Sequence, residues 1–112
     1  MGLLDMIKRN GGATLNADTL TDAGLSKGYA VGVAKGTAIV LPTDADDTTL
    51  GVALRLIAGA YNCAFVGAWV AEDGVHLDPV RVADTLDEAR TLGLRYEQRA
   101  VYDLGAGVEH AV

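Results

Sequence analysis

Four residues in the second half of the chain have side chains that could act together in catalysis or binding: Trp69, His76, Asp78 and Arg81. His76 and Asp78 are two positions apart, so on a β-strand both side chains point to one face of the sheet. A turn at Asp73–Gly74 would place Trp69 across from Asp78. The group could form an acid–base pair, supply two metal ligands or make a contact patch anchored by tryptophan. Because no nucleophile or third ligand is specified, we expect an interaction site without catalytic residues, metal or cofactor.

Other polar or reactive residues fit structural roles better than chemical ones. Lys35 precedes Gly36, whereas a phosphate-binding loop needs the sequence Gly-Lys-Ser/Thr before a helix. The acidic run 44–47 lacks the register and closing glutamate of a calcium loop, so we expect it to cap a helix. Cys63 is the only cysteine and cannot form an internal disulfide, which favours a small buried apolar role.

Composition limits the classes of partner. Half of the 112 residues are apolar, enough for one compact core, and 15 acidic residues against 9 basic ones give a net charge of -6. This charge argues against direct binding of nucleic-acid phosphates. The first residues lack the apolar run of a secretory signal, and no segment approaches the ~18 apolar residues of a membrane span. We therefore expect a soluble cytoplasmic protein without membrane contact.

The first 27 residues are predicted to form an N-terminal arm. Leu3, Leu4 and Ile7 share one side of a short helix that ends at the glycines after Asn10. The following residues to Lys27 are rich in Thr, Asn, Asp and Gly, which predicts an irregular segment held by isolated leucines. We expect residues 28–112 to form a single α+β domain.

Alternating apolar residues and turn signals predict six strands and two helices within this domain. The strands are expected at 29–34, 38–41, 64–71, 75–82, 99–104 and 108–112, and the helices at 46–60 and 85–92. The first two strands are expected to form a hairpin, Thr85 to begin the second helix through a capping box, and Gly93 to end it. The order (α)-β-β-α-β-β-α-β-β predicts an α+β fold with a largely antiparallel sheet.

One core is expected, built mainly from aliphatic residues of these elements: Val31, Val33, Ile39, Leu41, Leu54, Ile57, Val66, Val70, Leu77, Leu86, Val101 and Leu104. In the 65–82 hairpin, Val66, Val70, Val75 and Leu77 would share one face. The other face would carry Phe65, Trp69, His76, Asp78 and Val80. One layer of helices covers only one face, so we expect self-association, with 108–112 as the edge strand that pairs between subunits.

The chain resembles small uncharacterised proteins of actinobacteriophages and their prophages. The resemblance covers about residues 28–112 and lies in the Gly67-Ala68-Trp69 hairpin, the strand Val75-His76-Leu77-Asp78, the step Glu88-Ala89-Arg90 and the strand Ala100-Val101-Tyr102-Asp103-Leu104. His76 stands where those proteins usually have an aromatic residue. The resemblance implies a phage gene product acting in the cytoplasm of an actinobacterial host, and it implies no catalytic residue.

We therefore expect a phage-encoded accessory protein that is not an enzyme and that binds a host or phage protein as a small module. Two alternatives stay open. One is a small-ligand or metal-binding protein, or an enzyme, using the face of Trp69, His76, Asp78 and Arg81. The other is an acidic mimic of nucleic acid, which would need its carboxylates in a regular stripe.

Overall fold

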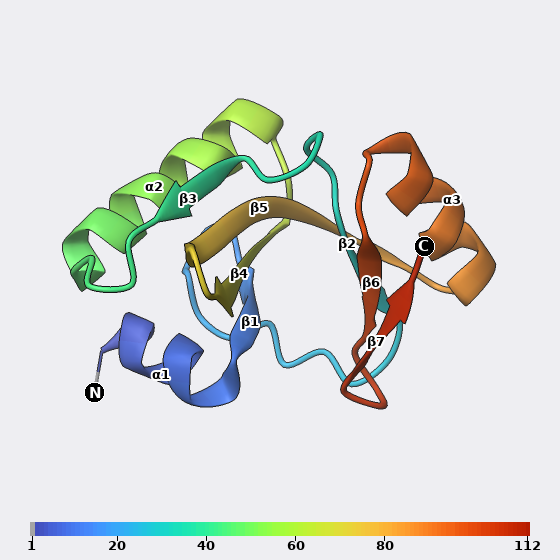
Figure 1. The fold of residues 1–112 in the computed structure, drawn as a ribbon, viewed down its shortest axis with the longest axis horizontal. Coiled ribbons are helices and arrows are strands. Elements are labelled where there is room, and N and C mark those ends of the chain that lie inside the picture. Colours follow the sequence, from blue (N-terminus) through green and yellow to red (C-terminus); the bar gives the residue numbers. More distant parts are fainter. Residues whose placement is uncertain (1) are drawn as a thin grey trace.

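The computed structural model describes residues 2–112, which form three helices and seven strands in one antiparallel sheet (Figure 1). The helices are α1 (Leu3–Asn10), α2 (Asp47–Tyr61) and α3 (Leu86–Arg95). The strands are β1 (Gly12–Asn16), β2 (Tyr29–Gly32), β3 (Ile39–Leu41), β4 (Phe65–Ala71), β5 (Gly74–Ala83), β6 (Ala100–Asp103) and β7 (Val108–Ala111). The sheet order is β1-β4-β5-β2-β6-β7, and β3 also pairs with β5. The predicted α+β class is confirmed.

The helix ends follow the predicted capping chemistry. Asp46 accepts a hydrogen bond from the Thr49 N–H at the start of α2, and Thr85 accepts one from the Glu88 N–H at the start of α3. Gly11 ends α1 with a φ of 78°. The expected end of α3 at Gly93 is wrong, because the helix continues to Arg95.

Gly93 serves packing between α3 and the end of the sheet. A Cβ at this position would lie 2.8 Å from Val112 Cγ2 and 3.3 Å from Val101 Cγ1. The missing side chain therefore lets α3 lie close to β6 and to the C-terminal residue.

The predicted hairpin of β4 and β5 is present with a shifted register. Its turn is formed by Glu72 and Asp73 instead of Asp73–Gly74, so Trp69 lies across from His76 and Gly67 lies across from Asp78. Each pairing moves by two residues, and a shift of two keeps every side chain on its face. The predicted division of the hairpin into two faces is therefore correct, although the individual pairs are not.

The expected hairpin between residues 29–34 and 38–41 does not form. β2 pairs with residues 80–83 of β5, and β3 pairs with residues 75–77 of the same strand. Both run antiparallel to β5, so residues 29–41 follow one edge of it, interrupted by the loop 33–38. The turn residues Lys35–Thr37 are placed as predicted, but the loop they form does not reverse the chain.

The N-terminal segment is built into the same sheet. Residues 13–16, expected to be irregular, form with Gly12 the edge strand β1, paired with β4 along its whole length. Leu4, Ile7 and Leu15 are buried beside the residues of α2. The first 27 residues therefore do not stand apart from the rest of the fold.

The buried residues form two clusters instead of the single expected core. The larger lies between α1, α2 and strands β1, β4 and β5; the smaller joins Val31 and Val101 to Ala89 of α3. Val33, Ile39, Leu41, Val70, Leu86 and Leu104 are only partly buried, whereas Ile7, Leu15, Leu50, Val75 and Val80 are fully buried and were not in the expected set. The register places both clusters on one face of the sheet.

The opposite face of the sheet is strongly curved. Trp69 on β4 and Tyr102 on β6 are separated by β5 and β2, which in a flat sheet would place these strands about 14 Å apart. Their ring centroids are nevertheless 5.5 Å apart, with the rings tilted by 47°. The sheet therefore curls toward itself, away from the three helices, and Trp69 lies on its concave side.

Candidate functional site

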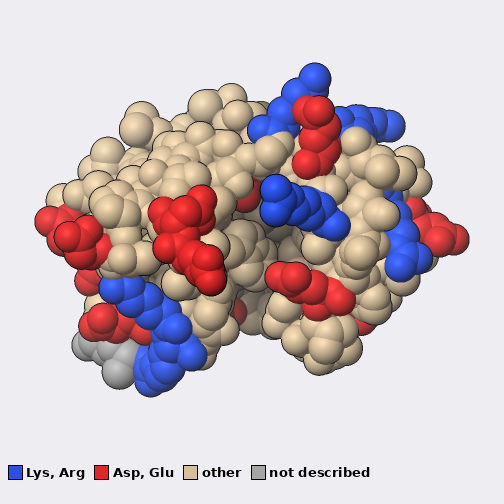
Figure 2. Space-filling model, viewed as in Figure 1, with Lys and Arg blue, Asp and Glu red and all other residues tan. Residues whose placement is uncertain are grey.

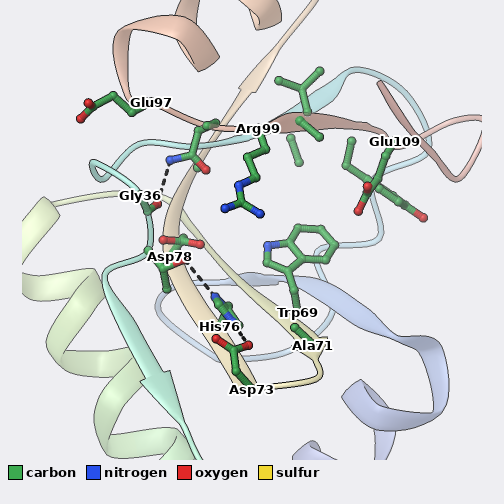
Figure 3. A pocket seen from close by; sticks show the side chains of 16 residues that line it. Gly36, Trp69, Ala71, Asp73, His76, Asp78, Glu97, Arg99 and Glu109 are labelled. Atoms are coloured by element: carbon green, nitrogen blue, oxygen red, sulfur yellow. Dashed lines mark hydrogen bonds and ion pairs between the residues drawn. The ribbon is translucent and has the colours of Figure 1, made fainter. Parts of the chain in front are cut away.

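The concave side of the sheet contains a hollow of about 580 Å³, within the range of ligand sites. Residues of β4 and β5 form one wall, the start of β6 forms the other, and the loop 33–38 closes one end (Figure 3). Trp69, His76 and Asp78 all line it, so the structure brings three of the four predicted site residues together.

A second hollow of about 400 Å³ lies on the other side of the aromatic pair, toward β1 and the β6–β7 turn. Trp69, Tyr102 and Glu109 line both hollows. The two spaces share these residues and are here called together the concave groove, with the Trp69–Tyr102 pair between them. Figure 2 shows this side of the molecule hollowed in the middle, with acidic and basic side chains around the depression.

The absence of a side chain at Gly12 on β1 leaves room for the indole ring of Trp69. A Cβ on Gly12 would lie 2.3 Å from Trp69 Cε3, too close for any side chain at that position. The ring of Trp69 is partly buried, between the backbone of β1 and Tyr102. The ring packs against β1 and Tyr102 and also remains partly accessible to solvent.

His76 is held by hydrogen bonds at both ring nitrogens. Its Nε2 lies 2.6 Å from Asp73 Oδ1, and its Nδ1 lies 3.0 Å from Thr37 Oγ1. The hydrogen bond with His76 is the main reason why the pKa of the Asp73 carboxyl is below its ordinary value. The chain Asp73–His76–Thr37 connects the β4–β5 turn to the loop 33–38, and both nitrogens are already engaged.

Asp78 is the buried acid of the groove. The residue is 4% exposed, and its Oδ1 accepts a hydrogen bond of 3.0 Å from the Ala38 N–H. Burial raises the pKa of this carboxyl, while the Ala38 N–H and the nearby charge of His76 oppose the rise. Within the described residues, no hydrogen bond or ion pair engages the second oxygen, Oδ2.

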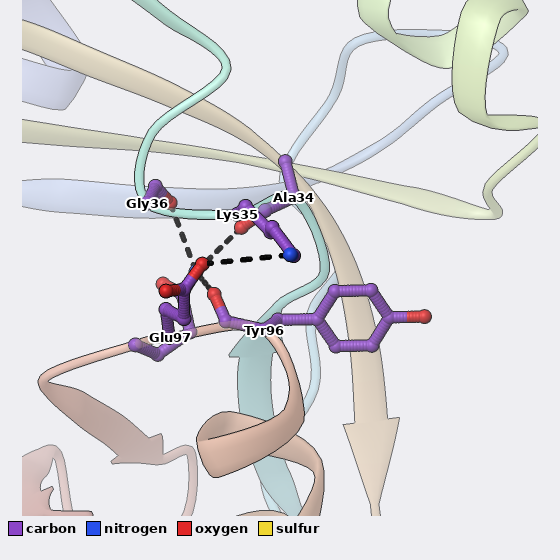
Figure 4. Close-up of polar contacts among 6 residues, drawn as sticks. Ala34, Lys35, Gly36, Tyr96 and Glu97 are labelled. Atoms are coloured by element: carbon purple, nitrogen blue, oxygen red, sulfur yellow. Dashed lines mark hydrogen bonds and ion pairs between the residues drawn. The ribbon is translucent and has the colours of Figure 1, made fainter.

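Gln98 fixes the loop that carries Thr37 and Ala38. Its Nε2 lies 2.7 Å from the Ala34 carbonyl oxygen, 2.9 Å from that of Gly36 and 3.0 Å from that of Tyr96 (Figure 4). An ion pair of 4.0 Å between Lys35 and Glu97 lies at the exposed surface of the same junction. Gln98 thereby sets the position of the Thr37 hydroxyl and the Ala38 N–H, which contact His76 and Asp78.

Arg99 is the only basic residue that lines the larger hollow, beside four acidic ones. Its side chain extends between Asp78 and Trp69 (Figure 3), yet it makes no hydrogen bond or ion pair within residues 2–112. No carboxylate of residues 2–112 lies within ion-pair distance of this arginine.

Arg81, the fourth predicted site residue, lies on the opposite face of β5. It is exposed and borders a shallow depression beside α3, with Asp87 and Arg95. Alternation explains the separation: His76 and Asp78 are at even positions of β5, and Arg81 is at an odd one. The register could have excluded Arg81 from the sequence alone.

The contributors to the groove that were not predicted include Gln98, Arg99 and Tyr102. Tyr102 lies in a strand that was predicted, but only the curl of the sheet brings it to Trp69. Gln98 lies between a helix and a strand, where no periodicity indicates the direction of a side chain. Arg99 was expected to begin the strand 99–104, but β6 begins at Ala100, so strand alternation does not set its direction. The cation of the site is Arg99, not Arg81.

Comparisons with known proteins find no match to this chain. No protein-family model matches the chain, and neither a curated protein nor a solved structure matches it. Among the described residues, no group of three His, Cys, Asp or Glu side chains could hold a metal ion. No helix in residues 2–112 combines the length and apolarity needed to cross a membrane.

Proposed function

We propose that the protein is a small, non-enzymatic binding module that holds a segment of another protein in the concave groove. The observation that carries the proposal is the Trp69–Tyr102 pair at the centre of a groove that continues on both sides of it. Tryptophan and tyrosine are enriched among the residues that dominate binding energy at protein interfaces.

The shape of the groove favours a polypeptide over a metabolite. Small-molecule sites bury most of their ligand in one enclosed cavity. Here two spaces meet at a shared aromatic pair, and the groove is open to solvent on the face seen in Figure 2. An extended segment could lie along the groove and cover both rings.

The chain Asp73–His76–Thr37 is the observation that most favours the alternative of an enzyme. A carboxylate, an imidazole and a hydroxyl in series are typical of acid–base catalysis. In this protein the series bridges the β4–β5 turn and the loop 33–38. We assign it a structural role in holding the wall of the groove.

The distribution of charge does not favour the alternative of an acidic mimic of nucleic acid. Acidic side chains in Figure 2 are scattered among basic ones and form no regular stripe on that face. The resemblance to actinophage proteins makes a host or phage protein of the bacterial cytoplasm the first partner to test.

A selection with random displayed peptides tests the proposed function. We expect immobilised wild type to enrich peptides that Trp69→Ala does not retain, and Tyr61→Ala, which removes an exposed aromatic outside the groove, to retain them. Ala71→Lys adds a second test, since it fills the groove from an exposed position and leaves Trp69 in place. Enrichment that is equal on all four proteins, or absent from wild type, would contradict the proposal.

A further inference from the structure

The charges around Trp69 indicate which chemistry the groove selects. Building on the proposed function, we infer that the bound segment presents a basic side chain whose cation lies between Asp78 and the Trp69 ring. Three features of the groove carry this inference: a buried carboxylate with an open oxygen, an excess of acidic side chains, and an arginine that already lies in the same space.

Asp78 provides the acceptor. It is almost completely buried, and within the described residues its one side-chain hydrogen bond comes from a neutral backbone N–H to Oδ1. A buried carboxylate is costly unless other charges or donors compensate it. No fully buried polar side-chain atom of the described residues lacks a partner, so Oδ2 is accessible, and Asp78 lines the larger hollow. A cation from outside can therefore supply the missing partner.

The remaining charges make the groove acidic. The larger hollow is lined by Asp73, Asp78, Glu97 and Glu109 against the single Arg99. Asp73 is engaged by His76, and Glu97 is near Lys35. Within the described residues, Asp78 and Glu109 have no ion-pair partner. An acidic groove on a chain of net charge -6 attracts basic segments and repels acidic ones.

Arg99 shows that a basic side chain fits the space. Its side chain extends into the hollow between Asp78 and Trp69, but it makes no ion pair there (Figure 3). The residue is exposed, so it can move into solvent when a partner's cation enters. The incoming cation would also lie near the faces of Trp69 and Tyr102, which attract cations.

Four peptide pools and four variants test the inference. The pools consist of capped nine-residue peptides with random flanks and arginine, citrulline, glutamate or alanine fixed at the centre. Citrulline keeps the shape of arginine without its charge. We expect wild type to capture the arginine pool at least about tenfold better than the citrulline pool, and Asp78→Asn to capture the two equally. Glu72→Gln, which removes one exposed carboxylate outside the groove, should keep the wild-type ratio.

Arg99→Gln and Trp69→Ala complete the design. Removing the competing cation with Arg99→Gln should raise capture of the arginine pool several-fold, whereas an acidic ligand would be lost. Capture that depends on Trp69 but shows no preference for arginine, or prefers glutamate, overturns the inference and leaves the proposed function standing. No Trp69-dependent capture from any pool overturns both. Melting curves for each variant establish that a lost signal comes from folded protein.

Discussion

Among single residues, Asp78 is expected to affect both the stability of the fold and the proposed binding. Its carboxylate is buried beside a histidine, and its partners within the protein leave one oxygen open. A site that binds a cation keeps such a charge at a cost in stability, which is a common trade at functional positions. The two contributions can be separated by changing the charge without changing the shape.

Asp78→Asn should stabilise the protein at pH 7 by about 1 kcal/mol, because the amide oxygen still accepts from Ala38 and no buried charge remains. The pKa of Asp78 is raised by folding, so wild type loses stability relative to the variant as pH rises from the ordinary value of 3.8 through the raised pKa. Urea unfolding from pH 3 to 8 measures the difference. A difference that grows toward acid pH would contradict the assignment.

Gly12→Ala should displace Trp69, since the new Cβ would lie 2.3 Å from the indole ring. We expect a loss of about 1–3 kcal/mol in the free energy of unfolding and a shift in fluorescence from the only tryptophan. Gly51→Ala is the control, because a Cβ there meets no atom within 4 Å and a helix interior favours alanine by about 0.5–1 kcal/mol. An unchanged emission spectrum in Gly12→Ala would show that Trp69 does not lie against β1.

Among the elements, the loop 33–38, which closes one end of the larger hollow, is held in place by a residue distant in the sequence, Gln98. Gln98 contacts three carbonyl oxygens at the junction of this loop with the end of α3. The hydrogen bonds that join Thr37 to His76 and Ala38 to Asp78 depend on the position of this loop.

Gln98→Met should therefore destabilise the protein by about 1–3 kcal/mol and speed hydrogen exchange at Gly36 and Ala38. Lys35→Met, which removes only an exposed ion pair of the same junction, should change stability by less than about 0.5 kcal/mol. Equal effects of the two substitutions would mean that Gln98 does not hold the loop.

The elements could be predicted better than their arrangement. Caps at Asp46 and Thr85 and the alternation of β4 and β5 are local signals, and they gave the helices and the faces of the hairpin. The pairing of β2 and β3 with β5 depends on partners far along the chain, so the turn residues 35–37 suggested a hairpin that is absent. The contact of Trp69 with Tyr102 depends on the curl of the whole sheet, which no local pattern encodes.

At the level of the whole molecule, β7 forms one edge of the sheet, where the Ala111 carbonyl oxygen accepts a hydrogen bond from Arg90 Nε. It pairs only with β6, and its first residue, Val108, is 47% exposed. Exposed edges are sites at which strands of other chains add. The expected self-association through 108–112 therefore remains a prediction for this edge.

Light scattering at high micromolar concentration should give about twice the monomer mass of 11.6 kDa. Val108→Lys should return the protein to a monomer, because charged residues at an edge oppose strand pairing. Val52→Lys, on the exposed face of α2, should leave the dimer intact. A monomeric wild type, or a dimer lost only in Val52→Lys, would contradict pairing through β7.

The indole N–H signal of Trp69 reports directly on whether a ligand binds in the concave groove. The chain has one tryptophan, so one side-chain peak in an amide correlation spectrum reports on the centre of the groove. During titration with a peptide selected on wild type, this peak and the backbone signals of Gly32, Thr37, Asp78 and Tyr102 should shift together and saturate. Saturable shifts confined to α2 or β7, with the Trp69 peak unmoved, would show that the concave groove is not the binding surface.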